Sequence, residues 1–252
     1  KNKKDTITIA LICFIIPFLL GFVLFYYLGF NTLTCFVVGL VLAITAEAIN
    51  GKILLELDIL DTDVGSTIIG IGLIDDLLGI FILALLMIYI NGIKKDCLLS
   101  IVIIITFLLG LKYRQKIDNK TIFLQEINNK KNVEIFKKIG LNILTPFFFI
   151  NMGLNLDLSN VIIRPNIIFL LISIAILGKV GGSLLSKPFV EYSLKQLNII
   201  GWGVNSRGAV DLTIALLAFR NGFIKKNIYS ALAITIIVTT FIFVIFSRNL
   251  LL

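Results

Sequence analysis

Two adjacent aspartates, Asp75 and Asp76, lie in the middle of the apolar stretch 70–86. A charged side chain near the centre of a membrane helix costs roughly 2.5–3.5 kcal/mol on insertion scales. Packing a lipid-facing helix requires neither carboxylate, so the pair indicates a functional site, and intramembrane carboxylates usually carry ions or protons. The alternative is a polar pair that only joins helices, but the second charge then adds a cost without any gain in packing.

Lys179 is a third charge inside an apolar run and is flanked by glycines. It lies eight residues before Lys187, or roughly 12 Å along a helix at 1.5 Å per residue. We therefore expect it to pair with one of the aspartates, although snorkelling toward the interface is the alternative. Gly72 and Gly79 share a helix face with Asp76, which would allow another backbone to cross closely beside it.

Two apolar segments, 34–50 and 198–220, are interrupted by polar residues. Interrupted segments at corresponding places in two halves of a chain are typical of discontinuous helices whose free backbone groups bind ions. For segment 34–50, the alternative is that the span ends at Thr45 and that Glu47 lies at the membrane interface. The polar residues that we expect to support the breaks are Thr45, Glu47, Asn50, Asn205, Arg207 and Asp211.

Arg207 is expected either to bind carbonyl groups freed by the break or to pair with Glu47 or Asp211. Asp211 follows Arg207 by four residues, the spacing of a pair within one helix. A purely structural role for Asp211 is therefore the alternative to a role in ion binding.

The composition is that of a membrane protein, with 58% hydrophobic residues and a mean hydropathy of +1.02. Apolar runs long enough to cross a bilayer recur along the chain, so the predicted fold is an all-α polytopic transmembrane bundle. About eight spans are expected, at 7–28, 34–50, 65–90, 97–113, 140–159, 166–187, 198–220 and 228–246.

The spans form two triplets with an insert between them. We expect residues 1–90 to form the first three-helix repeat, 91–165 a connecting region with a basic cytoplasmic loop, and 166–252 the second repeat. The two triplets cross in opposite senses, as in inverted-repeat transporters. Most lysines and arginines fall in cytoplasmic loops when both termini are placed inside the cell, so we expect a multi-pass protein of the cytoplasmic membrane.

Other features exclude several classes of function. The chain has no histidine, which excludes a histidine proton relay or pH switch. Cys13, Cys35 and Cys97 show no metal-ligand spacing, so a cysteine metal site is not expected. The net charge of +8 follows from the loop lysines and needs no nucleic-acid partner. No cofactor is expected, and the expected partners are ions and the lipid bilayer.

Several of these segments together resemble the monovalent cation:proton antiporter-2 family of the Kef and NapA type. The similar segments are 45–57, 70–79, Pro146–Leu154, Gly178–Lys179 and Arg207–Ala209. Their order and spacing agree over most of the chain, and the combination is specific although no single segment is.

The resemblance implies a secondary antiporter that exchanges Na⁺, or else K⁺ or Li⁺, for protons. It implies that Asp76 is the main cation and proton carboxylate, that Asp75 pairs with Lys179, and that transport is electrogenic. It further implies a core of two inverted triplets that moves past a separate dimerisation domain, with a homodimer where the scaffold helices are present.

The sequence departs from the family pattern at Glu47, where a small or apolar residue is common, and at Asn50, where threonine is common. Scaffold helices are few, which predicts either a fragment or a reduced homologue. A non-transporting or degenerate membrane subunit is therefore one alternative function. An intramembrane aspartyl protease is another, but Gly72-Leu73-Ile74-Asp75 lacks the second glycine of the protease motif.

Overall fold

The computed structural model describes residues 3–56, 58–91, 150, 153–157 and 165–251. All the regular structure in these ranges is helical, which confirms the predicted all-α bundle. The predicted span 97–113 and most of 140–159 lie outside the described residues. The elements are α1 (Lys3–Tyr27), α2 (Thr32–Ala43), α3 (Glu47–Glu56), α4 (Asp63–Asn91), α10 (Pro165–Leu185), η2 (Lys187–Phe189), α11 (Leu194–Gly203), α12 (Ala209–Arg220) and α13 (Lys226–Leu251).

The chain divides into two compact units, one of residues 1–79 and 156–252 and the other of residues 80–155. All the candidate site residues belong to the first unit, which is described below. In the second unit, the described residues are the last part of α4, residue 150 and residues 153–155.

Four of the described helices, α1, α4, α10 and α13, contain segments long and apolar enough to cross a membrane. The other long helices of the first unit come in pairs of 12 and 10 residues, α2 with α3 and α11 with α12. At 1.5 Å per residue each member covers about half of a bilayer core, so each pair amounts to one discontinuous span.

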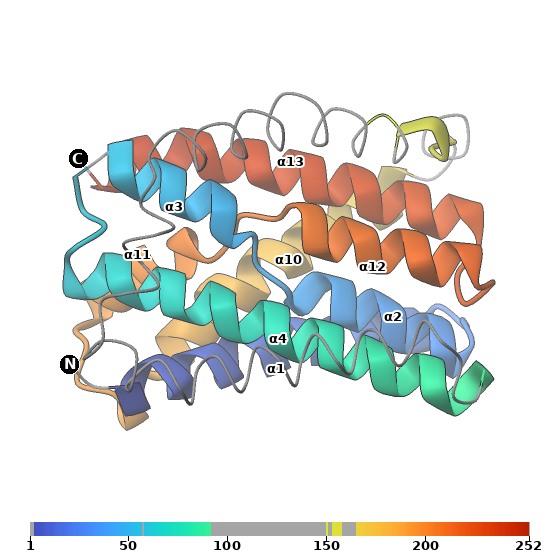
Figure 1. Ribbon diagram of the computed structural model, residues 1–252, viewed down its shortest axis with the longest axis horizontal. Helices are drawn as coiled ribbons and strands as arrows, with labels where there is room; N and C mark the ends of the chain where they lie inside the picture. Colours follow the sequence, from blue (N-terminus) through green and yellow to red (C-terminus); the bar gives the residue numbers. More distant parts are fainter. Residues whose placement is uncertain (1–2, 57, 92–149, 151–152, 158–164, 252) are drawn as a thin grey trace, which may run out of the picture. The chain divides into compact units, whose positions relative to one another are not determined.

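The discontinuous pair is the second member in each set of three. The first set is α1, α2/α3 and α4, and the second is α10, α11/α12 and α13. Figure 1 shows that α1 and α10 run in opposite directions, as do α2 and α12. The beginning of α1 and the end of α13 lie at the same end of this unit.

The break in the first discontinuous pair lies earlier than the sequence indicated. It comprises only residues 44–46, and α3 continues to Glu56, so the alternative that the span ends at Thr45 is wrong. Glu47 and Asn50 therefore lie in α3. The second pair begins at Leu194, four residues before the predicted start, and is interrupted at residues 204–208.

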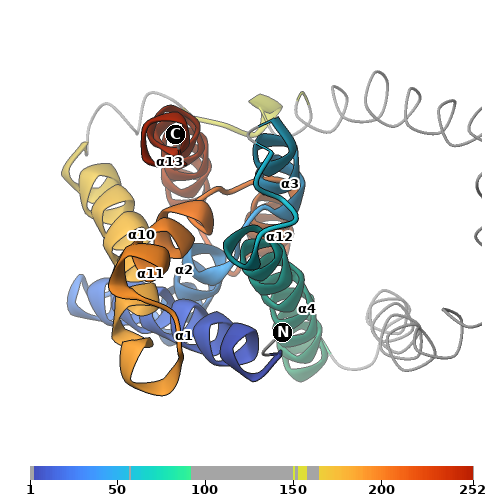
Figure 2. The same cartoon turned by 90° about the vertical axis from the view of Figure 1, so that its left-hand side faces the viewer.

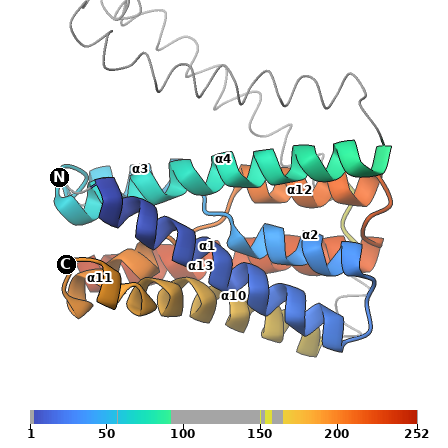
Figure 3. The same cartoon turned by 90° about the horizontal axis from the view of Figure 1, so that it is seen from below.

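Helix α2 occupies the centre of the unit, with α1, α10 and α12 around it (Figure 2). Nine of its twelve residues are buried. Helix α1 crosses α2 and α10, as Figure 3 shows. Glycines permit the close approach of α1 and α2, because a Cβ on Gly39 would lie 2.5 Å from the carbonyl oxygen of Phe18.

A Gly39→Ala variant should be less stable than the parent by about 1–3 kcal/mol, because the methyl group would force α1 and α2 apart. The matched control is Gly181→Ala in α10, where an added Cβ meets no described atom within 4 Å. Unfolding of the purified variants in detergent measures the difference. Equal stability of the two variants would contradict the close crossing.

Candidate functional site

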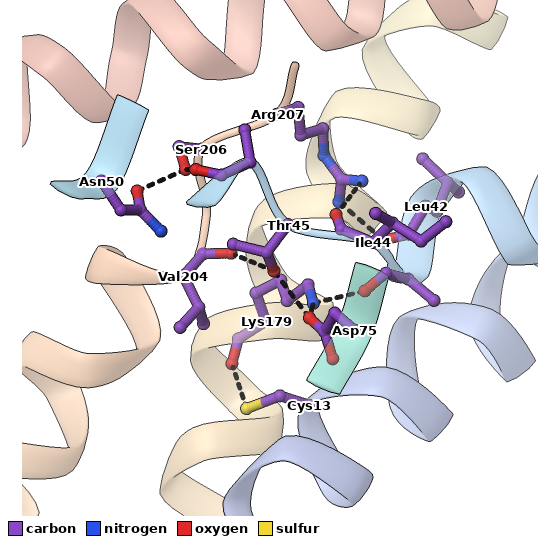
Figure 4. Close-up of polar contacts among 12 residues, drawn as sticks. Cys13, Leu42, Ile44, Thr45, Asn50, Asp75, Lys179, Val204, Ser206 and Arg207 are labelled. Carbon is purple, nitrogen blue, oxygen red and sulfur yellow. Dashed lines mark hydrogen bonds and ion pairs between the residues drawn. The ribbon is translucent and has the colours of Figure 1, made fainter. Parts of the chain in front are cut away.

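The two breaks cross each other and are joined backbone to backbone. The amide of Ala46 donates to the carbonyl oxygen of Ser206 at 2.9 Å. The Ser206 hydroxyl lies 3.0 Å from the Ala46 carbonyl oxygen and also contacts Oδ1 of Asn50 (Figure 4). Backbone groups that a break frees from the helical ladder thus find partners in the other break, which a low-dielectric environment requires.

Positive charges surround the carboxyl end of α2. The Arg207 guanidinium donates through Nη1 to the carbonyl oxygens of Val41 (3.0 Å) and Ile44 (3.3 Å), and through Nη2 to that of Leu42 (2.7 Å). Lys179 Nζ donates to the carbonyl of Ala43. The last carbonyls of a helix lack intrahelical donors and form the negative end of its dipole, so both cations stabilise this end.

The structure brings Asp75 and Lys179 together beside the crossing. Lys179 Nζ lies 2.7 Å from Asp75 Oδ2, and both side chains are completely buried. The same oxygen lies 2.7 Å from the hydroxyl of Thr45, which also lies 3.0 Å from the carbonyl oxygen of Val204. Helices α4 and α10 and both breaks therefore meet at one carboxylate (Figure 4).

Asp76 follows on α4 and is half-buried, whereas Asp75 has no exposed surface. Successive residues of a helix point about 100° apart, so the two carboxylates face different surroundings. Gly79, one turn further on, packs against Ile44 of the first break and Ile214 of α12. Asp76 is thus the more accessible carboxylate of the pair.

Asp211 lies in the first turn of α12 and is buried. Its Oδ1 accepts hydrogen bonds from the amides of Gly208 (2.8 Å) and Leu212 (3.0 Å). The spacing argument for a pair with Arg207 within one helix was wrong, because α12 begins at Ala209 and Arg207 precedes it. The carboxylate instead stabilises the amino end of the helix.

The remaining predicted residues occupy both sides of the crossing. Asn50 is buried in α3 against Ser206, and Asn205 is buried in the second break. Glu47 begins α3, but its side chain lies outside the described part of the chain. Sequence reasoning missed Ser206 and Thr240, whose hydroxyl contacts Arg207. Their only signal was a hydroxyl in an apolar segment.

Comparison with known families identifies the family of this chain. The family described as "Sodium/hydrogen exchanger, transmembrane" matches residues 1–112 and 117–251. The chain belongs to this exchanger family. Membership confirms the resemblance seen in the sequence to cation:proton antiporters.

Three curated relatives of this exchanger-family chain are named as antiporters. The Na(+)/H(+) antiporter of Enterococcus hirae is 23% identical over an alignment of length 252. The alignment covers 81% of this chain and 66% of the relative. The Na(+)/H(+)-K(+) antiporter GerN of Bacillus cereus is 25% identical over an alignment of length 286, which covers 96% of this chain and 74% of the relative. The probable Na(+)/H(+) antiporter GerT of the same organism is 24% identical over an alignment of length 279, which covers 93% of this chain and 74% of the relative.

The relatives are transporters by name, which favours transport over an intramembrane protease. The exchanger-family chain spans only part of each relative, 66% of the Enterococcus protein and 74% of each Bacillus protein.

Proposed function

We propose that this chain exchanges a monovalent cation, Na⁺ before K⁺ or Li⁺, for protons across the cytoplasmic membrane by alternating access. The observation that carries the proposal is the buried Asp75–Lys179 ion pair at the crossing of two broken helices, with Asp76 beside it. Membership of the exchanger family and the names of the relatives support the same activity.

Asp76 is the proposed binding group for both ions. It is half-buried, so an ion from water can reach it, whereas the side chain of Asp75 has no exposed surface. A carboxylate that holds either Na⁺ or a proton, but not both, makes the two ions compete for one place. Exposure of that place to each side of the membrane in turn then yields exchange.

The Asp75–Lys179 pair provides a second point of coupling. A cation that arrives at Asp76 adds positive charge close to Lys179, which weakens the hold of the lysine on Asp75. Because two buried charges are stable only while they are paired, breaking this pair is costly unless the arriving cation compensates for it, so cation binding and the state of the pair are coupled. This coupling favours the electrogenic exchange that the sequence resemblance implies.

The two sets of three helices form the proposed moving core, and residues 91–165 the proposed scaffold and dimer region. The proposal also puts both termini of the chain in the cytoplasm. The positions of the start of α1 and the end of α13 at one end of the first unit support a common side, and the lysine and arginine distribution selects the cytoplasm.

Reconstitution of the purified chain into vesicles that contain a pH dye tests the proposal. Addition of Na⁺, Li⁺ or K⁺ outside should alkalinise the interior, because the cation that enters is exchanged for protons that leave. Vesicles without protein are the control. If none of the three cations moves protons above that control, the proposed exchange is wrong.

A further inference from the structure

The hydroxyl of Thr240, in α13, contacts the backbone of the second break. The Arg207 amide donates to Thr240 Oγ1 at 3.1 Å, and the same oxygen lies 2.7 Å from the Arg207 carbonyl oxygen, to which it can donate. One side chain thus provides partners for both backbone groups of a residue outside any helix. In a low-dielectric environment, unpaired backbone groups cost several kcal/mol, so this is a substantial restraint on the break.

Neighbouring threonines of α13 behave differently. Thr235 donates to the carbonyl of Ala231 and Thr239 to that of Thr235, each at 2.8 Å. Such bonds to the preceding turn are the ordinary behaviour of threonine in membrane helices. Thr240 has the same option, because its Oγ1 lies 2.8 Å from the Ile236 carbonyl oxygen. The Arg207 amide can donate to Oγ1 in either case, whereas the Arg207 carbonyl competes with the Ile236 carbonyl for the single hydroxyl hydrogen.

The backbone of Arg207 determines where its guanidinium group lies. That group binds three carbonyl oxygens around the carboxyl end of α2, and the next residue after Ile44 is Thr45, whose hydroxyl contacts Asp75. A displacement of the second break would therefore move the end of α2 and a hydrogen-bond donor of the buried carboxylate.

We propose that Thr240 is a positioning residue for the cation site, an inference that rests on the proposed function. It fixes the second break against α13 in the position from which Arg207 holds the end of α2. A hydroxyl has one hydrogen, which either the Arg207 or the Ile236 carbonyl can accept. Thr240 can thus release the break without leaving its own hydroxyl unpaired.

Hydrogen exchange measured by mass spectrometry tests the restraint without any transport assay. One net hydrogen bond corresponds to roughly a tenfold change in an equilibrium constant, and Thr240 makes two contacts with the break. Thr240→Val should therefore accelerate exchange of the amides in residues 204–208 by about tenfold to a hundredfold. Thr240→Ser, which keeps the hydroxyl, should stay close to the parent protein.

Thr239→Val is the matched control, because Thr239 is the adjacent threonine, is buried and donates only within α13 among the described contacts. It should leave exchange at 204–208 unchanged. If Thr240→Val does not give folded protein, Thr240→Ala makes the same comparison. Parental exchange in a folded Thr240→Val or Thr240→Ala protein would overturn the proposal.

Transport kinetics separate positioning from a merely structural role. A loosened break lowers the fraction of molecules competent to bind, so the apparent KM for Na⁺ should rise by up to about tenfold in Thr240→Val and return in Thr240→Ser. A loss of folded protein would lower only the maximal rate, and that result would overturn the positioning role. If the parent protein itself moves no protons, the proposed function fails, while hydrogen exchange still decides whether Thr240 holds the break.

Discussion

An Asp76→Asn variant is expected to fold like the parent protein and to lose cation-driven proton movement in reconstituted vesicles. Asparagine has nearly the shape of aspartate, but it carries no charge to attract a cation and has no proton to exchange for one. A contact between a cation and a carboxylate at about 4 Å is worth about 4 kcal/mol near a protein surface. We therefore expect a loss of at least about a hundredfold in initial rate.

Asp63→Asn is the matched control for this prediction. Asp63 lies in the first turn of the same helix, α4, and outside the candidate site, so its variant should retain parental rates. Thermal unfolding in detergent shows whether both variants are folded. Parental transport by a folded Asp76→Asn protein would show that another group carries the ions, and Asp75 would be the next carboxylate to test.

The spans and the charged residues of the site could be predicted because each gives a strong local signal. Long apolar runs identify membrane helices, and Asp75, Lys179 and Arg207 stand out as charges within them. The depth of Lys179 predicted that it pairs with one of the two aspartates, and the family resemblance implied that this aspartate is Asp75. The structure places these two side chains in direct contact.

The limits of the first break could not be predicted, because they depend on contacts between distant parts of the chain. The residues that join the breaks, Ala46 and Ser206, are 160 positions apart. Local sequence indicated only that polar residues interrupt an apolar run, and it placed Asn50 in the break. Since α3 resumes at Glu47, the break is only three residues long, and the carbonyls of Ile44 and Ala46 accept hydrogen bonds from Arg207 and Ser206 of the second break.

Hydroxyl groups were missed for a different reason. Serine and threonine in membrane helices usually bond to their own backbone, so a sequence gives no indication when one of them reaches another element. Thr239 and Thr240 are adjacent and chemically identical, yet only Thr240 has a described contact with the second break. The direction in which each side chain points decides the difference, and that direction follows from how α13 packs.

Replacement of Lys179 by methionine should destabilise the protein by about 3–5 kcal/mol, because it leaves the buried charge of Asp75 without its partner. Asp75 Oδ2 would retain only the Thr45 hydroxyl, and Oδ1 has no hydrogen-bond partner among the described residues. Unfolding of the purified variant in detergent measures the loss. Lys195→Met, the same substitution at an exposed lysine of α11, should have little effect.

The double variant Lys179→Met with Asp75→Asn distinguishes the two roles of the lysine. If its main contribution is to neutralise Asp75, removal of both charges should recover most of the lost stability, since a neutral amide is far less costly to bury than a carboxylate. If the double variant is as unstable as Lys179→Met alone, the important contact is the one with the Ala43 carbonyl at the end of α2. Lys179 would then act mainly as a cap for the broken helix, and Asp75 would need another partner to hold its charge.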